Sequence, residues 1–79
     1  MKTDTTYNEM KRKLGLNIKH QRHLANLTQI QLAEKVSIHA QYLSDIERGR
    51  TDNSPSLFIL YSIAKTLEIP FSILFQNVD

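Results

Sequence analysis

The stretch from Leu27 to Arg50 constrains the fold most, because it holds two short helical patterns separated by a tight break. Thr28 can cap the first helix, and Gln31, three residues on, can complete a capping box. The break is Ser37-Ile38-His39, and the second pattern ends at Gly49, a residue free to take the left-handed conformation. Helices this short and this closely joined cannot pack antiparallel. We therefore expect them to cross steeply, with the second projecting from the body.

Helical periodicity continues on both sides of this stretch, and strand signals are nearly absent, so we predict an all-α fold. Before it, an apolar stripe is predicted at Leu14, Ile18 and Leu24. After it, Pro55 fixes the entry to a further helix capped by Ser54 or Ser56. The core stripe of that helix is predicted at Leu57, Leu60, Ala64 and Leu67. Pro70 then opens a last helical turn, residues 71–75.

The 79 residues suffice for one small domain. We expect a flexible N-terminal segment at 1–9 and a single domain at 10–79, with no room for a ligand-sensing domain and hence no small-molecule ligand. The absence of cysteine excludes disulfides and a thiolate zinc site. No apolar run is long enough for a membrane span, and the polar start does not resemble a signal peptide, so we expect a cytoplasmic protein that does not bind membranes. Two glycines are too few for a glycine-rich phosphate loop.

The net charge of +2 is unevenly distributed. Residues 1–26 carry six Lys and Arg against two Asp and Glu, whereas 27–54 and 55–79 each carry one more acidic than basic residue. A basic end on a near-neutral body indicates an anionic partner, most often nucleic acid. The alternative is a solvated basic tail.

The C-terminal helices carry more apolar side chains than one small domain can bury. We infer a homodimer that covers the excess, with an interface predicted at Phe58, Ile59, Tyr61, Ile63, Phe71 and Phe75. The alternative is a five-helix core that absorbs these side chains.

The two crossing helices are typical of a helix-turn-helix, and three motifs at matching spacing extend the likeness. They are T-Q-x-x-L-A from Thr28, Y-L-S-x-I-E-R-G from Tyr42 and P-S-L-x-x-L-x-x-I-A-x-x-L from Pro55. Over roughly residues 14–75 the chain resembles the Cro/repressor-type (XRE-like) helix-turn-helix DNA-binding family. In size it is also similar to restriction–modification controller proteins. The resemblance implies a compact, lambda-repressor-like bundle of five helices, a recognition helix at about His39 to Arg48, and homodimers on pseudo-palindromic operators in double-stranded DNA.

The resemblance also assigns candidate roles. Residues expected to face base edges are His39, Ala40, Gln41, Tyr42 and Asp45. Gln29 is expected to bond a phosphate at a helix N-terminus. Further backbone contacts are expected from Ser44, Arg48, Arg50, Thr51 and Asn53. Arg22 and Glu47 match a family ion pair whose role is structural, with phosphate contact by Arg22 as the alternative.

Several assignments have alternatives. Asp45 can pair with a neighbouring cation instead of a base, and Tyr42 can pack its ring and offer only its hydroxyl to a phosphate. Three positions depart from the family: Ser37 stands where glycine or asparagine is usual, His39 where a capping residue is common, and Gln21 where an aliphatic residue is usual. These departures affect the assignment of base-reading residues more than the fold.

Enzymatic readings have little support. His20 and His23 are spaced i, i+3 but lack a third ligand, so we expect no metal and no cofactor. Ser44, Asp45 and His39 are too close on one short helix to form a catalytic triad. The main rival to a transcriptional regulator is an antitoxin or antirepressor whose last two helices grip a protein partner.

Overall fold

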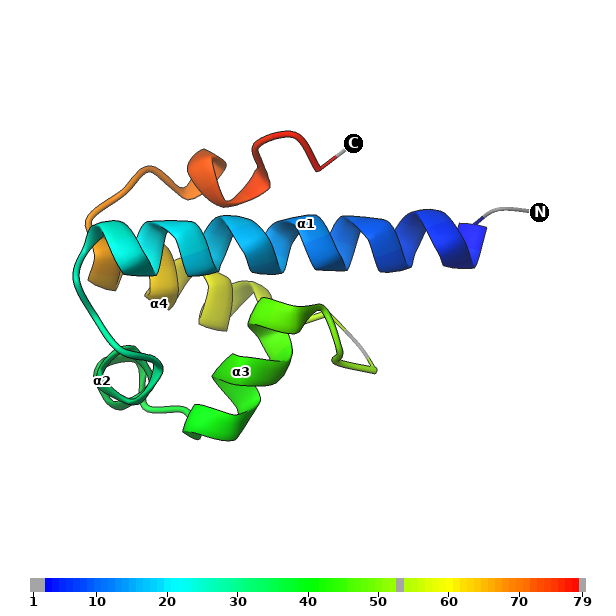
Figure 1. The fold of residues 1–79 in the computed structure, drawn as a ribbon. Coiled ribbons are helices and arrows are strands. Elements are labelled where there is room, and N and C mark those ends of the chain that lie inside the picture. Colours follow the sequence, from blue (N-terminus) through cyan, green and yellow to red (C-terminus); the bar gives the residue numbers. More distant parts are fainter. Residues whose placement is uncertain (1–2, 53, 79) are drawn as a thin grey trace.

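The computed structural model describes residues 3–52 and 54–78. Over this range the chain is helical and forms no strand, as predicted. The helices are α1 (Thr3–Leu24), α2 (Gln29–Val36), α3 (Ala40–Arg48), α4 (Leu57–Leu67) and the 3₁₀ helix η1 (Phe71–Phe75). In Figure 1, α1 is the central helix, with α2, α3 and α4 on one side and the C-terminal segment on the other. None of the helices in the described range is long and apolar enough to cross a membrane.

The prediction of five helices holds for four α-helices, while the fifth element is a 3₁₀ turn. Its five residues follow Pro70 directly, and 3₁₀ geometry is common in such short pieces. Asn17 on α1 fixes the segment by donating from Nδ2 to the carbonyls of Leu74 at 2.9 Å and Gln76 at 2.8 Å. Leu74 is thereby held in the core.

α1 begins at Thr3, so it includes residues 3–9 of the segment 1–9 that the sequence analysis expected to be flexible. Leu14 and Ile18 are buried as expected, but the side chain of Leu24 is 63% exposed. Leu24 follows Ile18 by six residues, which turns it about 240° away from the buried face.

The core lies where α1, α2, α3, α4 and η1 meet. Its buried apolar side chains are Leu14, Ile18, Leu32, Ala33, Leu43, Ile46, Leu60, Ile63, Ala64, Leu67 and Leu74. On α4 the structure corrects two predictions: Leu57 is 71% exposed, and Ile63, expected outside the core stripe, is fully buried. The inner face of α4 thus runs from Leu60 through Ile63 and Ala64 to Leu67.

The ends of the helices follow from local sequence. Thr28 and Gln31 form the expected capping box on α2, and the Ser56 hydroxyl accepts from the N–H of Ile59 at the start of α4. Ser37 ends α2 in the left-handed region at φ +66°, and Gly49 ends α3 at φ +69°. The break between the two helices is therefore made by a serine in a conformation that costs it energy.

Both glycines of the chain lie where α1 crosses the end of α3. A Cβ atom on Gly15 would lie 2.3 Å from the carbonyl oxygen of Ile46, and one on Gly49 would lie 2.7 Å from the Cα of Arg12. The two backbones therefore approach as closely as they do only because neither position carries a side chain. This contact holds the C-terminal end of α3 against α1.

Candidate nucleic-acid interface

A buried ion pair between α1 and α3 sets the position of the candidate interface. Arg22 donates from Nε to Oε2 of Glu47 at 2.7 Å and from Nη2 to Oε1 at 3.0 Å. A third guanidinium nitrogen, Nη1, donates to the carbonyl of Leu27 at 2.8 Å. Gln29 on α2 also donates to Glu47 Oε1, at 2.9 Å. The carboxylate of Glu47 thus connects α1, α2 and α3, which confirms the structural pairing of Arg22 with Glu47.

The N-terminal half of α3 projects away from α1 (Figure 1). Of the residues predicted to read bases, this half carries Ala40, Gln41 and Tyr42, whereas His39 is the N-cap and Asp45 lies one turn after Gln41. His39 and Gln41 are exposed, while Ala40, Tyr42 and Asp45 are half-buried. His39 occupies the N-cap position but makes no side-chain capping bond, so its imidazole is not committed to the helix end.

Two of these side chains are already in contact. Gln41 Nε2 donates a hydrogen bond to Asp45 Oδ1 at 3.1 Å, one helical turn away. Tyr42 packs partly against the core, in line with the alternative in which its ring is structural. The exposed edge of α3 therefore presents amide, carboxylate, phenol and imidazole groups from the predicted set.

Ser44, predicted to reach a phosphate, and Arg22, for which phosphate contact was the alternative, both lie in the interior. Ser44 is 8% exposed and Arg22 is 5% exposed. Ser44 is buried with Leu43, Ile46 and Glu47 on the inner side of α3, where residues three or four positions apart are neighbours. The structure thus corrects the sequence analysis, and neither side chain is available to a ligand at the surface.

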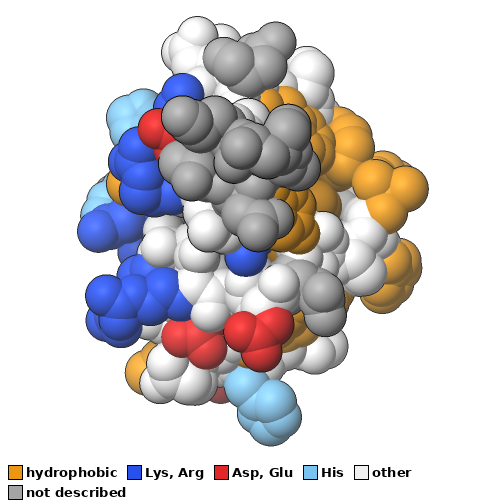
Figure 2. Space-filling model, turned by 90° about the vertical axis from the view of Figure 1, so that its right-hand side faces the viewer, with side chains coloured by type: hydrophobic (Ala, Val, Ile, Leu, Met, Phe, Trp, Pro, Cys, Tyr) orange, Lys and Arg blue, Asp and Glu red, His pale blue; other side chains and the backbone are white. Residues whose placement is uncertain are grey.

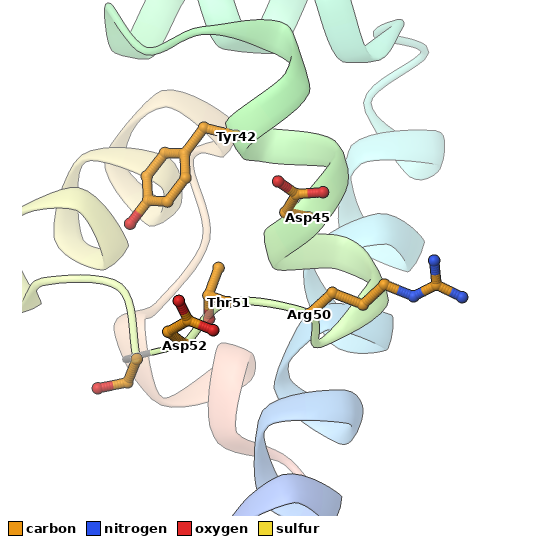
Figure 3. A pocket seen from close by; sticks show the side chains of 6 residues that line it. Tyr42, Asp45, Arg50, Thr51 and Asp52 are labelled. Carbon is orange, nitrogen blue, oxygen red and sulfur yellow. The ribbon is translucent and has the colours of Figure 1, made fainter.

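The segment after α3 forms one wall of an open polar hollow of about 350 Å³. It is lined by Tyr42, Asp45, Arg50, Thr51, Asp52 and Ser54. Figure 3 shows the Arg50 side chain pointing away from Tyr42 and Asp52. Arg48 and Arg50 are exposed and Thr51 is half-buried, whereas Asn53 lies outside the described residues. Asp52 was not among the predicted site residues, although its carboxylate lies beside them.

Charge and apolar surface are segregated. Figure 2 shows Lys and Arg side chains gathered on one side of the molecule and hydrophobic side chains on the opposite side. The apolar side includes an open hollow of about 380 Å³ lined by Leu57, Phe58, Tyr61 and Phe71. The molecule therefore has one face suited to binding an anion and an opposite face suited to apolar contacts.

Five of the six residues predicted for a dimer interface remain accessible. Phe58 is 75% and Tyr61 51% exposed, and Ile59, Phe71 and Phe75 are half-buried. The rings of Phe71 and Phe75 pack edge to face with their centroids 5.2 Å apart. Ile63 belongs to the core and is therefore not available for a dimer interface. Leu57, which sequence periodicity assigned to the core, joins this face.

Within residues 3–52 and 54–78, no three His, Asp or Glu side chains are grouped closely enough to hold a metal ion. His20 and His23 are both exposed on α1.

The chain is similar to a known protein family. A family model described as helix-turn-helix matches residues 18–74. The immunity repressor protein of Bacillus phage phi105 is 46% identical over 59 residues, which is 75% of this chain and 40% of that protein. The chain thus spans about two fifths of the length of the curated relatives it matches.

Two solved structures are similar over most of the chain. The restriction–modification controller protein C.AhdI from Aeromonas hydrophila has a TM-score of 0.75 and 28% identity, over 81% of this chain and 94% of that chain. The clp gene regulator ClgR from Corynebacterium glutamicum has a TM-score of 0.80 and 26% identity, over 87% of this chain and 71% of that chain.

Proposed function

Because this chain belongs to the Cro/repressor-type helix-turn-helix family of DNA-binding transcriptional regulators, we propose that it binds a pseudo-palindromic operator as a homodimer. The observation that carries the proposal is the placement of α3. Its C-terminal end is fixed by the Arg22–Glu47 pair and the two glycine contacts, and its N-terminal end exposes Gln41. In helix-turn-helix proteins the N-terminal residues of the second helix contact base edges in the major groove.

The dimensions of α3 fit a DNA groove. Its nine residues span about 13 Å at 1.5 Å per residue, and the major groove of B-DNA is about 12 Å wide. Gln41 suits the N6 and N7 atoms of adenine, Asp45 can accept from the N4 amine of cytosine, and Ala40 can contact a thymine methyl. His39 and Tyr42 flank them. The hydrogen bond between Gln41 and Asp45 orients both groups before DNA arrives.

Phosphate contacts would come from both ends of the helix-turn-helix. Gln29 is the first residue of α2, where the helix dipole favours an anion. One amide N–H of Gln29 bonds Glu47, which leaves the other for a phosphate oxygen. On the opposite side of α3, Arg48, Arg50 and Thr51 would contact the backbone, which fixes register without selecting sequence. Asn53 remains a candidate from the sequence alone.

A second copy of the chain would cover the apolar face of α4 and η1. Exposed apolar patches of this kind mark interaction sites. Here the exposed fractions of Leu57, Phe58 and Tyr61 all exceed half. A symmetric dimer would present two α3 helices about 34 Å apart, one turn of DNA. Operator occupancy would then depend on the concentration of the chain through dimerisation.

The same apolar face supports a second candidate function, an antitoxin or antirepressor module that acts through a different protein. Sedimentation of the purified chain separates the two. The regulator hypothesis is supported if the wild-type chain is a homodimer and Phe58→Ser is a folded monomer. Leu24→Ser, an equally polar change at an exposed leucine of α1, is the control and should leave the dimer intact. A wild-type chain that stays monomeric until a foreign partner is added supports the module.

Selection of bound fragments from a random duplex library tests the DNA claim. We expect recovery of a two-fold related sequence with half-sites about one helical turn apart. The observed affinity should fall with salt, with a slope near −0.9 per neutralised phosphate. A library that shows no enrichment at low salt would refute the proposed function.

A further inference from the structure

We propose that Tyr7 and Lys11, in the N-terminal half of α1, are positioning residues for DNA binding: they hold the connection between α3 and α4 so that Arg50 and Thr51 meet the DNA backbone. The inference rests on the proposed function and extends it to a part of the chain that helix-turn-helix geometry leaves unexplained. Both residues precede residues 18–74, to which the family model is matched.

Three contacts join these residues to each other and to the connection. The ammonium of Lys11 donates to the carbonyl of Thr51, although the two residues are 40 positions apart. The N–H of Ser54 donates to the hydroxyl of Tyr7 at 2.9 Å, across 47 positions. Lys11 Nζ also lies 4.8 Å from the centroid of the Tyr7 ring, within cation–π range.

Lys11 is buried, with 6% of its surface exposed. A lysine is seldom buried unless its ammonium is paired, and here a carbonyl and an aromatic face take the place of a carboxylate. Hydrogen bonding with Ser54 lowers the pKa of Tyr7 below its usual value, and the charge of Lys11 acts in the same direction. Tyr7 and Lys11 thus contact the connection at Ser54 and Thr51 and also contact each other.

The connection needs this support because residues 50–52 and 54–56 form no helix or strand in the structure. Without regular hydrogen bonds, the carbonyl of Thr51 and the N–H of Ser54 are satisfied by side chains of α1. Arg50 lies between Gly49, which packs on the backbone of Arg12, and the anchored Thr51. A connection ordered during folding loses less entropy when it binds DNA, so each phosphate contact contributes more to affinity.

The test compares Tyr7→Phe with wild type on the duplex that wild type selects. The substitution keeps the ring over Lys11 and removes only the hydroxyl that Ser54 contacts. We expect binding to weaken about 3–10-fold, the effect of one lost hydrogen bond, and equally on all duplexes. Thr6→Val, which removes a hydroxyl from the exposed neighbour on α1, is the matched control and should bind like wild type.

Coupling to Arg50 distinguishes positioning from general destabilisation. In an Arg50→Ala background, Tyr7→Phe should cost little further affinity, because the contact through which it acts is gone. The same fold loss in both backgrounds, or no loss in either, would overturn the inference while wild-type binding upholds the proposed function. A wild-type chain that selects no duplex would instead refute the proposed function itself.

Amide hydrogen exchange gives a readout that needs no DNA. Exchange at Ser54 should accelerate in Tyr7→Phe and in Lys11→Met while core amides such as that of Ile18 stay protected. Unchanged exchange at Ser54 in both variants would overturn the positioning role.

Discussion

Arg22 on α1 and Glu47 on α3 form a bidentate ion pair whose side chains are 6% and 1% exposed. A buried pair of this kind is poor evidence for stability, because desolvation offsets much of the attraction between the charges. Its geometric effect is clearer. The carboxylate also accepts from Gln29 on α2, so one group fixes the relative positions of three helices. The tilt at which α3 leaves the body therefore depends on two buried side chains, Arg22 and Glu47.

Removing one charge of the pair should be far more costly than removing both. Glu47→Gln leaves the guanidinium of Arg22 buried without a counter-charge, and we expect a loss of about 3–5 kcal/mol in the free energy of unfolding. The double variant Arg22→Met, Glu47→Leu should lose much less. Urea denaturation measures all three chains. A double variant at least as unstable as Glu47→Gln would contradict this account.

Replacing Gly15 with alanine should lower the stability of the fold, although helix propensity alone predicts an increase. Alanine is favoured over glycine inside a helix by about 1 kcal/mol. Because the added Cβ would lie 2.3 Å from the carbonyl oxygen of Ile46, α1 and α3 must separate, and we expect Gly15→Ala to destabilise the fold by about 1–3 kcal/mol. His20→Ala, at an exposed site on the same helix, should change stability by less than about 0.5 kcal/mol. A higher midpoint of thermal unfolding in Gly15→Ala than in wild type would refute the close approach of α1 and α3.

Replacing Ser37 with glycine should make the fold more stable. Ser37 has φ +66°, a conformation that is less favourable by roughly 1–2 kcal/mol for a residue with a side chain but not for glycine. Part of the gain is lost to the greater freedom of glycine in the unfolded chain, so we expect Ser37→Gly to stabilise by up to about 1 kcal/mol. Ser62→Gly, inside α4, should destabilise. Chemical denaturation that shows both variants destabilised would mean that Ser37 is not strained.

Features encoded by neighbouring residues could be predicted from the sequence. The capping box of Thr28 and Gln31 and the left-handed end at Gly49 depend on contacts within one or two turns. The pairing of Arg22 with Glu47 was available only through the family resemblance, since the residues are 25 positions apart.

Features that depend on tertiary contacts were missed. Because α4 is apolar nearly all round, its periodicity does not select a buried face, and Leu57 and Ile63 were interchanged. Lys11 and Tyr7 contact residues 40 and 47 positions further along the chain, and no local sequence pattern indicates such contacts. A signal did exist for the α1–α3 crossing, since Gly15 is an isolated glycine inside a helical pattern.

The central claim is that the free end of α3 reads bases while the surrounding residues only position it. Affinity for the selected operator and for every single-base-pair change in it, measured for Gln41→Ala and Gln29→Ala, tests this most directly. Gln41→Ala should lose discrimination at one base pair in each half-site, worth about 1–3 kcal/mol there, and keep it elsewhere. Gln29→Ala should weaken all duplexes equally. A Gln41→Ala chain that keeps the full wild-type base preference would contradict the claim.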